Sequence, residues 1–522
     1  MKYKALLLTS GIGSRLGNVT LYTNKVLVRV GDKPALSYII DCYDESIEII
    51  VVLGHFGNQV KDYLEIAYPS RNFQFVWVDN YSQPGSSLVY SLLQAKDKID
   101  CPFIYHACDT LIFADSIPEP SKNWLGGHKS EKGTEYTSFN VIDDHVVKIF
   151  NKGEQDFDYI YVGLAGIYDY QKFFNEITNL YNQESMNSQL SDVDVSAKLV
   201  EKGIKYGYAN FPSWLDIGNI DKLKEARALF TPQIEVLDKE TESIYLVDNQ
   251  VIKFFYDEEV VAERVARAKI LKGLVPDIIN VKPNFYSYKY VQGQVLSSVI
   301  TEELMDQFLE WSKCNLWKRN SDGANIYQLC QKFYFEKTRK RIATFLEKYN
   351  IKDKAEIING CAVPKIFDML DSIPFSRLCT TESYTFHGDY ILDNVLVTEN
   401  GFTLLDWRQD FGGDLFAGDI YYDLAKLNHN LIFNHKIISN KNFIIELRDS
   451  TTVDLLISYN LWSCKEKYTQ FLKTNNFDIE KVNLLTAIIW LNMSPLHDYP
   501  VDIFLYYFGK LNLFRVLKGK SL

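Results

Sequence analysis

An apolar strand that leads directly into a glycine-rich loop is the feature that most constrains this chain. Leu6–Leu16 reads LLLTSGIGSRL, so backbone with small side chains follows a buried strand. Further short apolar runs occupy 46–54, 73–78 and 103–108. Segments of helical spacing, such as 86–96, separate the runs, and that alternation is typical of a sheet with helices on both faces. We therefore predict an α/β N-terminal domain whose glycine loop lies at the carboxyl edge of its sheet.

The chain is too long for one compact core, because 522 residues normally divide into two or three domains. Its composition changes at 228–243, where a charged helix gives way to a Thr-Pro turn and an acidic stretch. We place the domain boundary there, with domains at 1–230 and 231–522. The second domain is expected to be α+β, with strands at about 235–295 and mostly helices at about 296–522.

Composition and charge exclude several classes of protein. The net charge of −11 argues against broad binding of nucleic acid or anionic membranes, both of which need basic surfaces. No run of about eighteen apolar residues occurs, so no membrane span is expected. The eight cysteines are scattered, and the N-terminus lacks the pattern of a secretion signal. A cytoplasmic protein with reduced thiols is the expectation.

The loop after the first strand carries the residue types that hold phosphate groups. Gly11, Gly13 and Ser14 allow backbone N–H groups to approach a phosphate, and Arg15 and Lys25 add positive charge. A glycine loop alone is weak evidence, since plain tight turns also use glycine. The longer pattern, GxGSRL followed by NKVL and a Lys-Pro pair, is more specific.

That longer pattern resembles the sugar-phosphate nucleotidyltransferase family, which has a Rossmann-like mixed sheet. The resemblance implies that Asp109 and Asp216, in FIYHACD and WLDIG, bind one Mg²⁺ together with a nucleoside triphosphate. It also implies that Lys152 contacts the phosphate of the acceptor. Asn151 departs from the family, where a glutamate at this position holds sugar hydroxyls.

The reaction implied by this resemblance is attack of an acceptor phosphate on the α-phosphorus of a nucleoside triphosphate, with release of pyrophosphate. Lys25 and Arg15 are the expected catalytic residues, because they neutralise the charge that grows on the leaving group.

A second signature lies almost four hundred residues further along the chain. Phe386–Trp407 contains His387-Gly-Asp389, then Asn394, then Asp406. Phosphoryl transfer needs a carboxylate near the acceptor hydroxyl and two oxygen ligands on the metal that bridges the phosphates of ATP. The spacing of this signature supplies all three.

The same signature is similar to the aminoglycoside phosphotransferase and choline kinase group, which has a protein-kinase-like fold. The similarity implies that Asp389 accepts or orients the hydroxyl proton and that Asn394 and Asp406 bind Mg²⁺. His387 is assigned to substrate binding, although in such kinases this histidine more often braces the loop.

Three upstream residues complete the implied nucleotide site. Lys253 is placed as the strand lysine that contacts phosphate, and Glu263 as its ion-pair partner, with Glu259 as the rival. Tyr290 falls in the segment that resembles the hinge for adenine.

Together the two signatures predict a bifunctional enzyme that uses Mg²⁺, ATP and a second nucleotide, CTP, UTP or GTP. ATP would phosphorylate a small sugar, polyol or amino alcohol, and nucleotidyl transfer to that phosphate would give an activated precursor for surface glycans. One alternative is a choline kinase joined to a CTP:phosphocholine cytidylyltransferase. The other is a nucleotide-sensing regulatory protein with inactive sites. The aromatic residues Trp462, Trp490 and Tyr506 would form a cage for a quaternary amine or, as is more common, part of the core.

Overall fold

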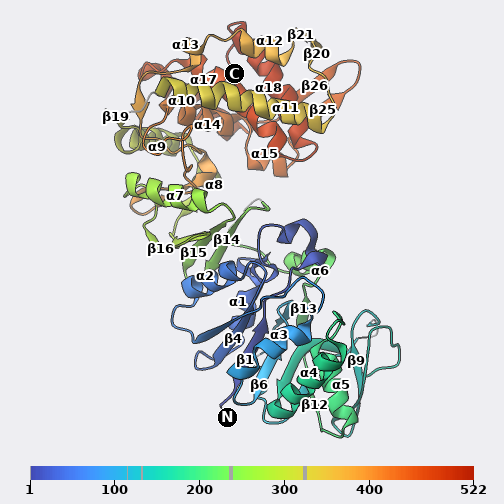
Figure 1. The fold of residues 1–522 in the computed structure, drawn as a ribbon. Helices are drawn as coiled ribbons and strands as arrows, with labels where there is room; N and C mark the ends of the chain where they lie inside the picture. Colours follow the sequence, from blue (N-terminus) through green and yellow to red (C-terminus); the bar gives the residue numbers. More distant parts are fainter. Residues whose placement is uncertain (1, 115, 131–132, 234–238, 321–325) are drawn as a thin grey trace. The chain divides into compact units, whose positions relative to one another are not determined.

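The computed structural model describes residues 2–114, 116–130, 133–233, 239–320 and 326–522 (Figure 1). The chain forms two compact units, one made of Met1–Glu258 with Ile279–Tyr290 and the other of Glu259–Ile278 with Val291–Leu522. Among the described helices, none is both long and apolar enough to cross a membrane. The glycine loop belongs to the first unit and the His-Gly-Asp signature to the second.

A mixed sheet forms the centre of the first unit. Its parallel part contains β1 (Lys4–Leu8), β4 (Glu48–Leu53), β5 (Phe73–Trp77) and β6 (Phe103–His106), with β1 between β4 and β6. The long strand β11 (Tyr159–Ile167) runs antiparallel to β6 and continues the sheet. Strands therefore form where the apolar runs predict them, and the α/β class with a mixed sheet is confirmed for this part of the chain.

Further elements extend this sheet and cover it. The remaining strands are β8 (Trp124–His128), β9 (Ser138–Ile142), β10 (His145–Phe150) and β12 (Gly207–Asn210). The helices are α1 (Ala35–Ile40), α2 (Gly57–Ala67), α3 (Leu88–Gln94), α4 (Tyr170–Glu184), α5 (Asp192–Glu201) and α6 (Ile220–Ala228). Two short ladders pair β2 (Arg29–Val30) with β3 (Lys33–Pro34) and β7 (Thr110–Ile112) with β13 (Trp214–Asp216).

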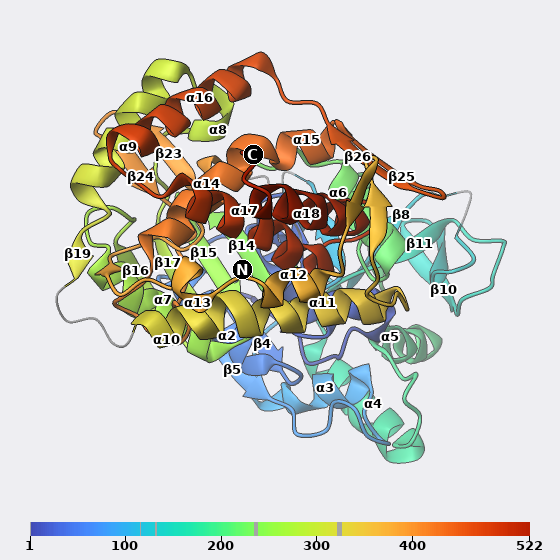
Figure 2. The same cartoon turned by 90° about the horizontal axis from the view of Figure 1, so that it is seen from above.

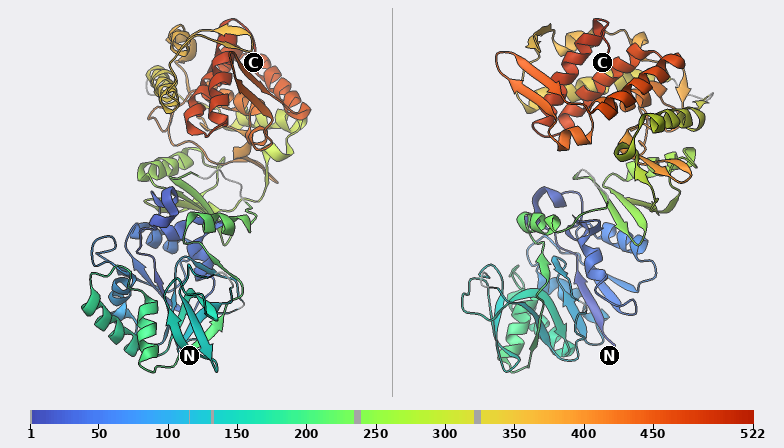
Figure 3. Two further views of the ribbon diagram at one scale, coloured as in Figure 1. Left: turned by 90° about the vertical axis from the view of Figure 1, so that its right-hand side faces the viewer. Right: turned by 180° about the vertical axis from the view of Figure 1, so that it is seen from behind.

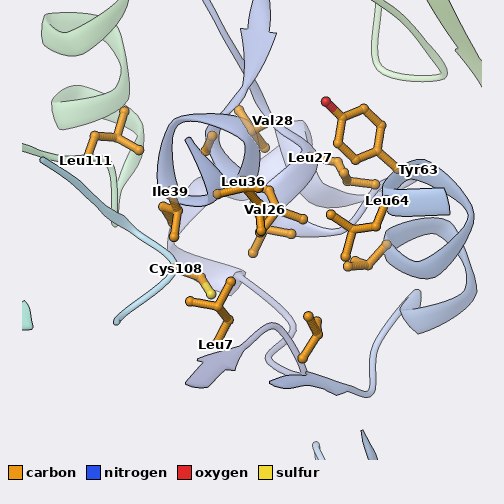
Figure 4. Packing of buried hydrophobic residues seen from close by; sticks show 14 of the residues in the cluster. Leu7, Val26, Leu27, Val28, Leu36, Ile39, Tyr63, Leu64, Cys108 and Leu111 are labelled. Atoms are coloured by element: carbon orange, nitrogen blue, oxygen red, sulfur yellow. The ribbon is translucent and has the colours of Figure 1, made fainter. Parts of the chain in front are cut away.

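The helices cover both faces of the sheet, because neighbouring side chains of a strand point to opposite faces. Leu7 of β1 belongs to a buried cluster with Leu36 of α1 and Leu64 of α2, which Figure 4 shows at close range. Leu6, its neighbour, packs on the other face with Phe173 of α4. The strand ends that carry the glycine loop are thus held between two layers of helices.

A second sheet packs against the first unit's core. Its strand order is β14 (Glu242–Val247), β15 (Gln250–Phe255), β17 (Phe285–Lys289) and β16 (Ile278–Lys282). Tyr245, Phe254 and Phe285 are fully or almost fully buried in the same cluster as Tyr63 of α2, and the Tyr245 hydroxyl donates a hydrogen bond to the Leu27 carbonyl (2.7 Å).

The predicted boundary after residue 230 lies between α6 and this second sheet, whereas the compact units divide after Glu258. The difference has a physical reason. The acidic, Thr-Pro-containing stretch is a change in local composition, while compactness follows the apolar side chains that β14, β15 and β17 bury against α2.

The second unit is mainly helical, as the sequence predicts for the residues after about 300. Its helices are α7 (Glu258–Ile270), α8 (Leu296–Val299), α9 (Glu302–Asn315), α10 (Ile326–Gln331), α11 (Lys337–Lys348), α12 (Ile366–Asp371), α13 (Phe375–Leu378), α14 (Ile420–Ile432), α15 (His435–Ser439), α16 (Tyr459–Thr474), α17 (Ile479–Met493) and α18 (Val501–Leu517). Both views of Figure 3 show most of these helices gathered into one bundle.

The core of this bundle is rich in aromatic side chains. Helices α17 and α18 pack against each other and α14 packs against α17, as Figure 2 shows from above. Trp490 and Tyr506 are buried in this packing, while Trp462 is half exposed on α16. For Trp490 and Tyr506, therefore, the core interpretation is confirmed and the cage is not.

Short strands interrupt the helices of the second unit. The hairpin β23 (Val395–Thr398) and β24 (Gly401–Leu404) follows Asn394, and β18 (Gln294–Val295) pairs with it. A second group consists of β20 (Glu356–Ile358), β21 (Cys361–Val363), β25 (Phe443–Leu447) and β26 (Thr451–Leu455), and a small ladder joins β19 (Arg319–Asn320) to β22 (Ser383–Tyr384). The hairpin positions a candidate site residue, because Asp406 follows the end of β24 by two residues.

Candidate active sites

The segment that carries Lys25 is fixed by a buried asparagine. The Asn24 side chain donates hydrogen bonds to the carbonyls of Thr9 (2.9 Å) and His55 (2.6 Å), at the ends of β1 and β4. Its oxygen accepts a hydrogen bond from the Val26 N–H (3.0 Å) and caps the short 3₁₀ helix Lys25–Leu27. Asn24 therefore holds Lys25 at the carboxyl edge of the sheet, a role that the motif alone did not indicate.

The two glycines of the loop have different requirements. Gly13 has a φ of +75°, and a Cβ at this position would lie 2.8 Å from the Cβ of Lys25. Gly11 has open space, since a Cβ there would meet no heavy atom within 4 Å. Gly13 is thus required by backbone conformation and by the close approach of Lys25.

The loop closes over a small cavity of about 130 Å³. Gly13, Ser14, Arg15, Lys25 and Asp109 all line it, with Leu16, Cys108, Ile217 and Gly218. The Lys25 amine lies 3.4 Å from an Asp109 carboxylate oxygen, and the Arg15 guanidinium lies 3.9 Å from the same oxygen. The Asp109 carboxylate raises the pKa of Lys25, and Lys25 in turn lowers the pKa of Asp109. Lys25 is therefore cationic and Asp109 anionic at neutral pH.

Asp216 approaches Asp109 from β13, far along the chain, and its neighbours Ile217 and Gly218 line the cavity. The pairing of β13 with β7 continues as a hydrogen bond from the Ile217 N–H to the Asp109 carbonyl (2.9 Å). A Cβ on Gly218 would lie 2.9 Å from an Asp216 carboxylate oxygen and 3.5 Å from one of Asp109. Both carboxylates therefore converge on one point.

This pair of carboxylates has the donor chemistry that suits Mg²⁺. Magnesium takes oxygen ligands and usually keeps several waters, with one or two protein carboxylates and the phosphates of a substrate. No group of three or more His, Cys, Asp or Glu side chains arranged to hold a metal occurs among the described residues. Asp109 and Asp216 fit a magnesium ion that a nucleotide shares.

Two residues near Asp216 were not anticipated. Its second carboxylate oxygen accepts hydrogen bonds from the Lys222 amine (2.8 Å) and from the Tyr136 hydroxyl (2.9 Å). Lys222 also forms an ion pair with Glu135 (3.2 Å). Lys222 lies on α6, close to Asp216 in the sequence. That closeness along the chain could have indicated that the lysine contacts Asp216.

Lys152 does not join this cavity. It is exposed in the turn that follows β10, and it is absent from the residues that line the cavity. Its predicted contact with an acceptor phosphate stays a prediction.

In the second unit, the His-Gly-Asp loop is held by a buried carboxylate. Asp423, on α14, accepts hydrogen bonds from the backbone N–H groups of His387 and Gly388, both at 2.7 Å. Gly388 has a φ of +87°, and a Cβ there would lie 2.5 Å from the Cβ of Arg408. The loop conformation therefore depends on glycine and on Asp423.

A buried arginine supports the same loop from α7. The Arg267 guanidinium donates hydrogen bonds to the carbonyls of Phe386, Leu415 (2.8 Å) and Arg408 (3.2 Å). Arg267 is fully buried. Nothing in the local sequence of α7 distinguishes this arginine from the exposed charges around it, so its role emerges only from the fold.

Asp389 is held ionised by a lysine from α14. Burial opposes ionisation of Asp389, but the Lys426 amine, 2.7 Å from its carboxylate, outweighs burial and lowers the pKa of Asp389 to about 2. The Asn394 amide donates to the other carboxylate oxygen of Asp389 (3.1 Å) and to its carbonyl (2.9 Å). Lys426 was missed, because it lies on a helix far downstream of the motif.

Asn394 and Asp406 lie next to each other. The Leu405 N–H donates a hydrogen bond to the Asn394 carbonyl (2.7 Å), so the residue before Asp406 is tied to Asn394. Asp406 has a φ of +55° and forms an ion pair with Arg264 of α7 (3.0 Å). The amide oxygen of Asn394 and the carboxylate of Asp406 are oxygen donors, and as such they fit Mg²⁺.

His387 is a structural residue in this geometry. Its side chain is fully buried, and its Nε2 lies 2.8 Å from the Leu405 carbonyl. Burial lowers the pKa of His387 to about 4, so the ring is neutral at pH 7. The assignment of His387 to substrate binding is therefore corrected: the ring braces the loop and presents no surface to a substrate.

The remaining predicted nucleotide residues lie in different units. Lys253 is almost fully buried on β15, where it is opposite Ile244 and Tyr286. Tyr290 directly follows β17 and donates its N–H to the Asn249 carbonyl (2.9 Å). Both belong to the first unit, whereas Glu263 lies half-buried on α7 in the second.

Comparisons with known proteins concern the N-terminal part of the chain. No family model matches the sequence. The chain is 33% identical over 112 residues to the choline-phosphate cytidylyltransferase of Streptococcus pneumoniae, covering 21% of this chain and 46% of that protein. It is 29% identical over 170 residues to the 2-aminoethylphosphonate cytidylyltransferase of Lancefieldella rimae, covering 31% of this chain and 66% of that protein.

A third relative is the bifunctional protein GlmU of Methanococcus maripaludis, 25% identical over 257 residues, with coverage of 48% of this chain and 60% of that protein. Among solved structures, that of CTP:phosphocholine cytidylyltransferase from Streptococcus pneumoniae has 21% identity and a TM-score of 0.38, covering 44% of this chain and 99% of the other.

The chain spans between 46% and 66% of the length of these three curated relatives. Its N-terminal part is homologous to nucleotidyltransferases. The resemblance of the C-terminal part to small-molecule kinases stays a prediction.

Proposed function

We propose that this chain is a two-step enzyme that phosphorylates a small molecule and then joins the new phosphate to a nucleotide. The observation that carries the nucleotidyl step is that Arg15, Lys25 and Asp109 line one cavity and that the Asp216 carboxylate converges with that of Asp109 beside Gly218. The kinase step is supported by the Asp389, Asn394 and Asp406 constellation. The order follows from chemistry, because the second reaction consumes the phosphate that the first one makes.

In the nucleotidyl step, an oxygen of the acceptor phosphate attacks the α-phosphorus of a nucleoside triphosphate in line, and pyrophosphate leaves. Lys25 and Arg15, which lie 3.4 Å and 3.9 Å from Asp109, would neutralise the negative charge that grows on pyrophosphate. Asp109 and Asp216 would hold Mg²⁺, which supplies Lewis-acid stabilisation of the same charge. Lys222 and Tyr136 keep the Asp216 carboxylate in place.

CTP is the nucleotide that the comparisons favour. Two relatives are cytidylyltransferases by name, one for choline phosphate and one for 2-aminoethylphosphonate. UTP and GTP remain the other candidates, because sugar-phosphate nucleotidyltransferases as a family use them too. The activated product would serve the decoration of a surface glycan.

In the kinase step, Asp389 orients the acceptor hydroxyl toward the γ-phosphorus of ATP and takes up its proton late in the transfer. A carboxyl with a pKa of about 2 is a weak base, so orientation is its main contribution. Asn394 and Asp406 would hold Mg²⁺, which would neutralise negative charge on the phosphates of ATP. The acceptor is a small alcohol, with sugars and polyols as the first candidates and choline as the alternative.

Two substitutions test whether the sites work independently. Asp389→Asn is expected to lower ATP-dependent phosphorylation by about 10³-fold or more while leaving nucleotidyl transfer to a supplied phosphate intact. Lys25→Ala is expected to do the reverse, with a loss of about 10²-fold or more. ³¹P NMR with ATP, CTP and pooled acceptors reports both steps in one tube.

Lys33→Ala serves as the control for Lys25, because Lys33 forms a partly exposed ion pair with Asp41 away from the cavity. Loss of both activities in a folded single variant would contradict the two-site proposal. Absence of acceptor-dependent turnover across a broad panel would instead favour the nucleotide-sensing alternative.

A further inference from the structure

Four basic side chains gather near Phe333, and one of them, Lys426, contacts Asp389. They are Lys337 and Arg341 of α11, Arg408 after the β23–β24 hairpin, and Lys426 of α14. The Lys337 amine lies over the Phe333 ring at 3.9 Å, and the Arg408 guanidinium lies over the same ring at 5.0 Å.

The ring of Phe333 links this group to the catalytic loop. Phe333 packs edge-on against Tyr422 of α14, with 4.9 Å between the ring centroids. Lys426 follows Tyr422 by one helical turn and reaches Asp389 at 2.7 Å. Arg408 is tied to the loop by its N–H, which donates to the His387 carbonyl (2.9 Å).

The backbone around Phe333 is unusual. Lys332–Glu336 forms a π-helical turn between α10 and α11. Such turns are rare and often occur at functional sites, because the extra residue redirects the side chains that follow. Here the turn carries Phe333 and leads directly into Lys337.

The positive charge of this group is only partly compensated within the described part of the chain. The Lys337 amine forms no ion pair and no hydrogen bond there, and the Arg341 guanidinium donates a hydrogen bond to the Asn492 carbonyl (3.1 Å). Arg408 has Asp410 as an acidic neighbour at 3.8 Å. Burial, with Arg408 and Arg341 nearby, lowers the pKa of Lys337 to about 6, so its amine is mostly neutral at pH 7 until an anion beside it favours the charged form.

A cationic cluster of this kind is unsuited to a quaternary amine. Such ligands bind where aromatic faces are open and negative charge is near. In this cluster the face of Phe333 is already occupied by Lys337 and Arg408, and like charges repel a cationic ligand. An anionic group, by contrast, would receive charge-assisted hydrogen bonds from these side chains.

We propose that the acceptor of the kinase step is a small hydroxy acid: an alcohol that also carries a carboxylate, phosphonate or phosphate, which Lys337, Arg341 and Arg408 bind. This inference rests on the proposed kinase function. The acceptor oxygen forms the new bond to the γ-phosphorus, the bond to ADP breaks, and the hydroxyl proton leaves through Asp389 to solvent. The anion fixes the acceptor while Asp389 orients its hydroxyl.

Matched pairs of acceptors test the proposal with the full-length protein, Mg²⁺ and ATP. The two pairs are glycerate with glycerol and 2-hydroxyethylphosphonate with ethylene glycol. Choline is tested beside them as a cationic alcohol. ADP release is measured for each compound. The anionic member of each pair is expected to have a kcat/KM at least about tenfold higher. The two anionic compounds also separate a carboxylate from a phosphonate.

Lys337→Gln is the matching variant. This substitution is expected to raise the KM for the anionic acceptor and to leave the KM for ATP unchanged. The ratio of kcat/KM between the anionic and the neutral acceptor of each pair should then fall toward one. Lys340→Gln is the control, because Lys340 lies exposed on the same helix.

The outcomes separate the two levels of the proposal. Preference for the neutral or cationic acceptor, or a Lys337→Gln effect on the KM for ATP instead of the acceptor, would overturn the hydroxy-acid inference and leave the kinase in place. No phosphorylation of any acceptor would overturn the kinase step itself, and the inference with it.

Discussion

At the scale of single residues, both candidate sites use the same device, a carboxylate paired with a buried or half-buried lysine. Lys25 faces Asp109 and Lys426 faces Asp389. Motif spacing singled out Lys25, Asp109 and Asp389 as candidates, because it reports residues that are close along the chain. Lys426 and Lys222 escaped prediction, since only tertiary packing brings α14 and α6 to their partners.

The pairing of Asp389 with Lys426 predicts the pH dependence of the kinase step. The folded-state pKa of Asp389 is depressed to about 2, so this carboxylate stays ionised as pH falls from 8 to 4 and protonates only near pH 2. Lys426→Met removes the cation but keeps the burial that raises the pKa. The acid limb of kcat/KM is therefore expected to move up from near pH 2 by about two pH units or more, to above pH 4.

A pH profile of ADP release between pH 4 and 8 measures this limb, with Lys436→Met on α15 as the control, since Lys436 is exposed. If the acid limb lies at the same pH in Lys426→Met and in the wild-type protein, the group that titrates in this limb is not Asp389.

At the scale of elements, the glycine loop shows what a pattern can and cannot predict. The strand before the loop and the position of Lys25 after it follow from apolar runs and spacing. The unequal roles of Gly11 and Gly13 do not, because they depend on the backbone angle and on the distance to Lys25. The meeting of β13 with β7, which brings Asp216 to Asp109, is likewise a long-range pairing that local sequence does not encode.

Substitution of the two glycines separates these roles. Gly13→Ala is expected to cost about 1–2 kcal/mol in the free energy of unfolding, because alanine disfavours the left-handed region, and to displace Lys25 with at least a tenfold loss of nucleotidyl transfer. Gly11→Ala is expected to change stability by less than about 0.5 kcal/mol.

Thermal melts and pyrophosphate release measure both effects. A rise in the KM for CTP in Gly11→Ala, without a change in melting temperature, would place the nucleotide phosphates against that part of the loop. Equal loss of stability in both variants would contradict the distinction.

At the scale of the whole molecule, the sequence predicts domains at 1–230 and 231–522, whereas the first compact unit contains Met1–Glu258 and Ile279–Tyr290. The sheet β14–β17 was expected to belong with the helical C-terminal part, as it would in a kinase-like domain. In the structure it buries Tyr245, Phe254 and Phe285 in the core that contains Tyr63. A change of composition marks a turn in the chain, whereas burial of apolar area decides which elements fold together.

Truncation tests this assignment. A fragment of residues 1–230 lacks the second sheet and exposes the apolar face of α2 around Tyr63, whereas a fragment of residues 1–290 keeps both sheets. Each large apolar side chain that is no longer buried lowers the free energy of unfolding by roughly 1.5–3 kcal/mol. The shorter fragment is therefore expected to have a lower melting temperature or to aggregate. Differential scanning calorimetry and gel filtration compare the two, and equal stability would show that the second sheet is dispensable for the first unit.

The shared core around Tyr63 also has a consequence for how such a chain can be recombined. A crossover at residue 231 would combine α2 from one parent sequence with Tyr245, Phe254 and Phe285 from another. The buried side chains of this one core would then come from two proteins and would not be matched to each other. A crossover near residue 291 would keep that core intact, because Phe285 would stay with Tyr63. Exchange of nucleotidyltransferase specificity between related chains, in nature or in the laboratory, is therefore best made as a cassette that carries the second sheet with it.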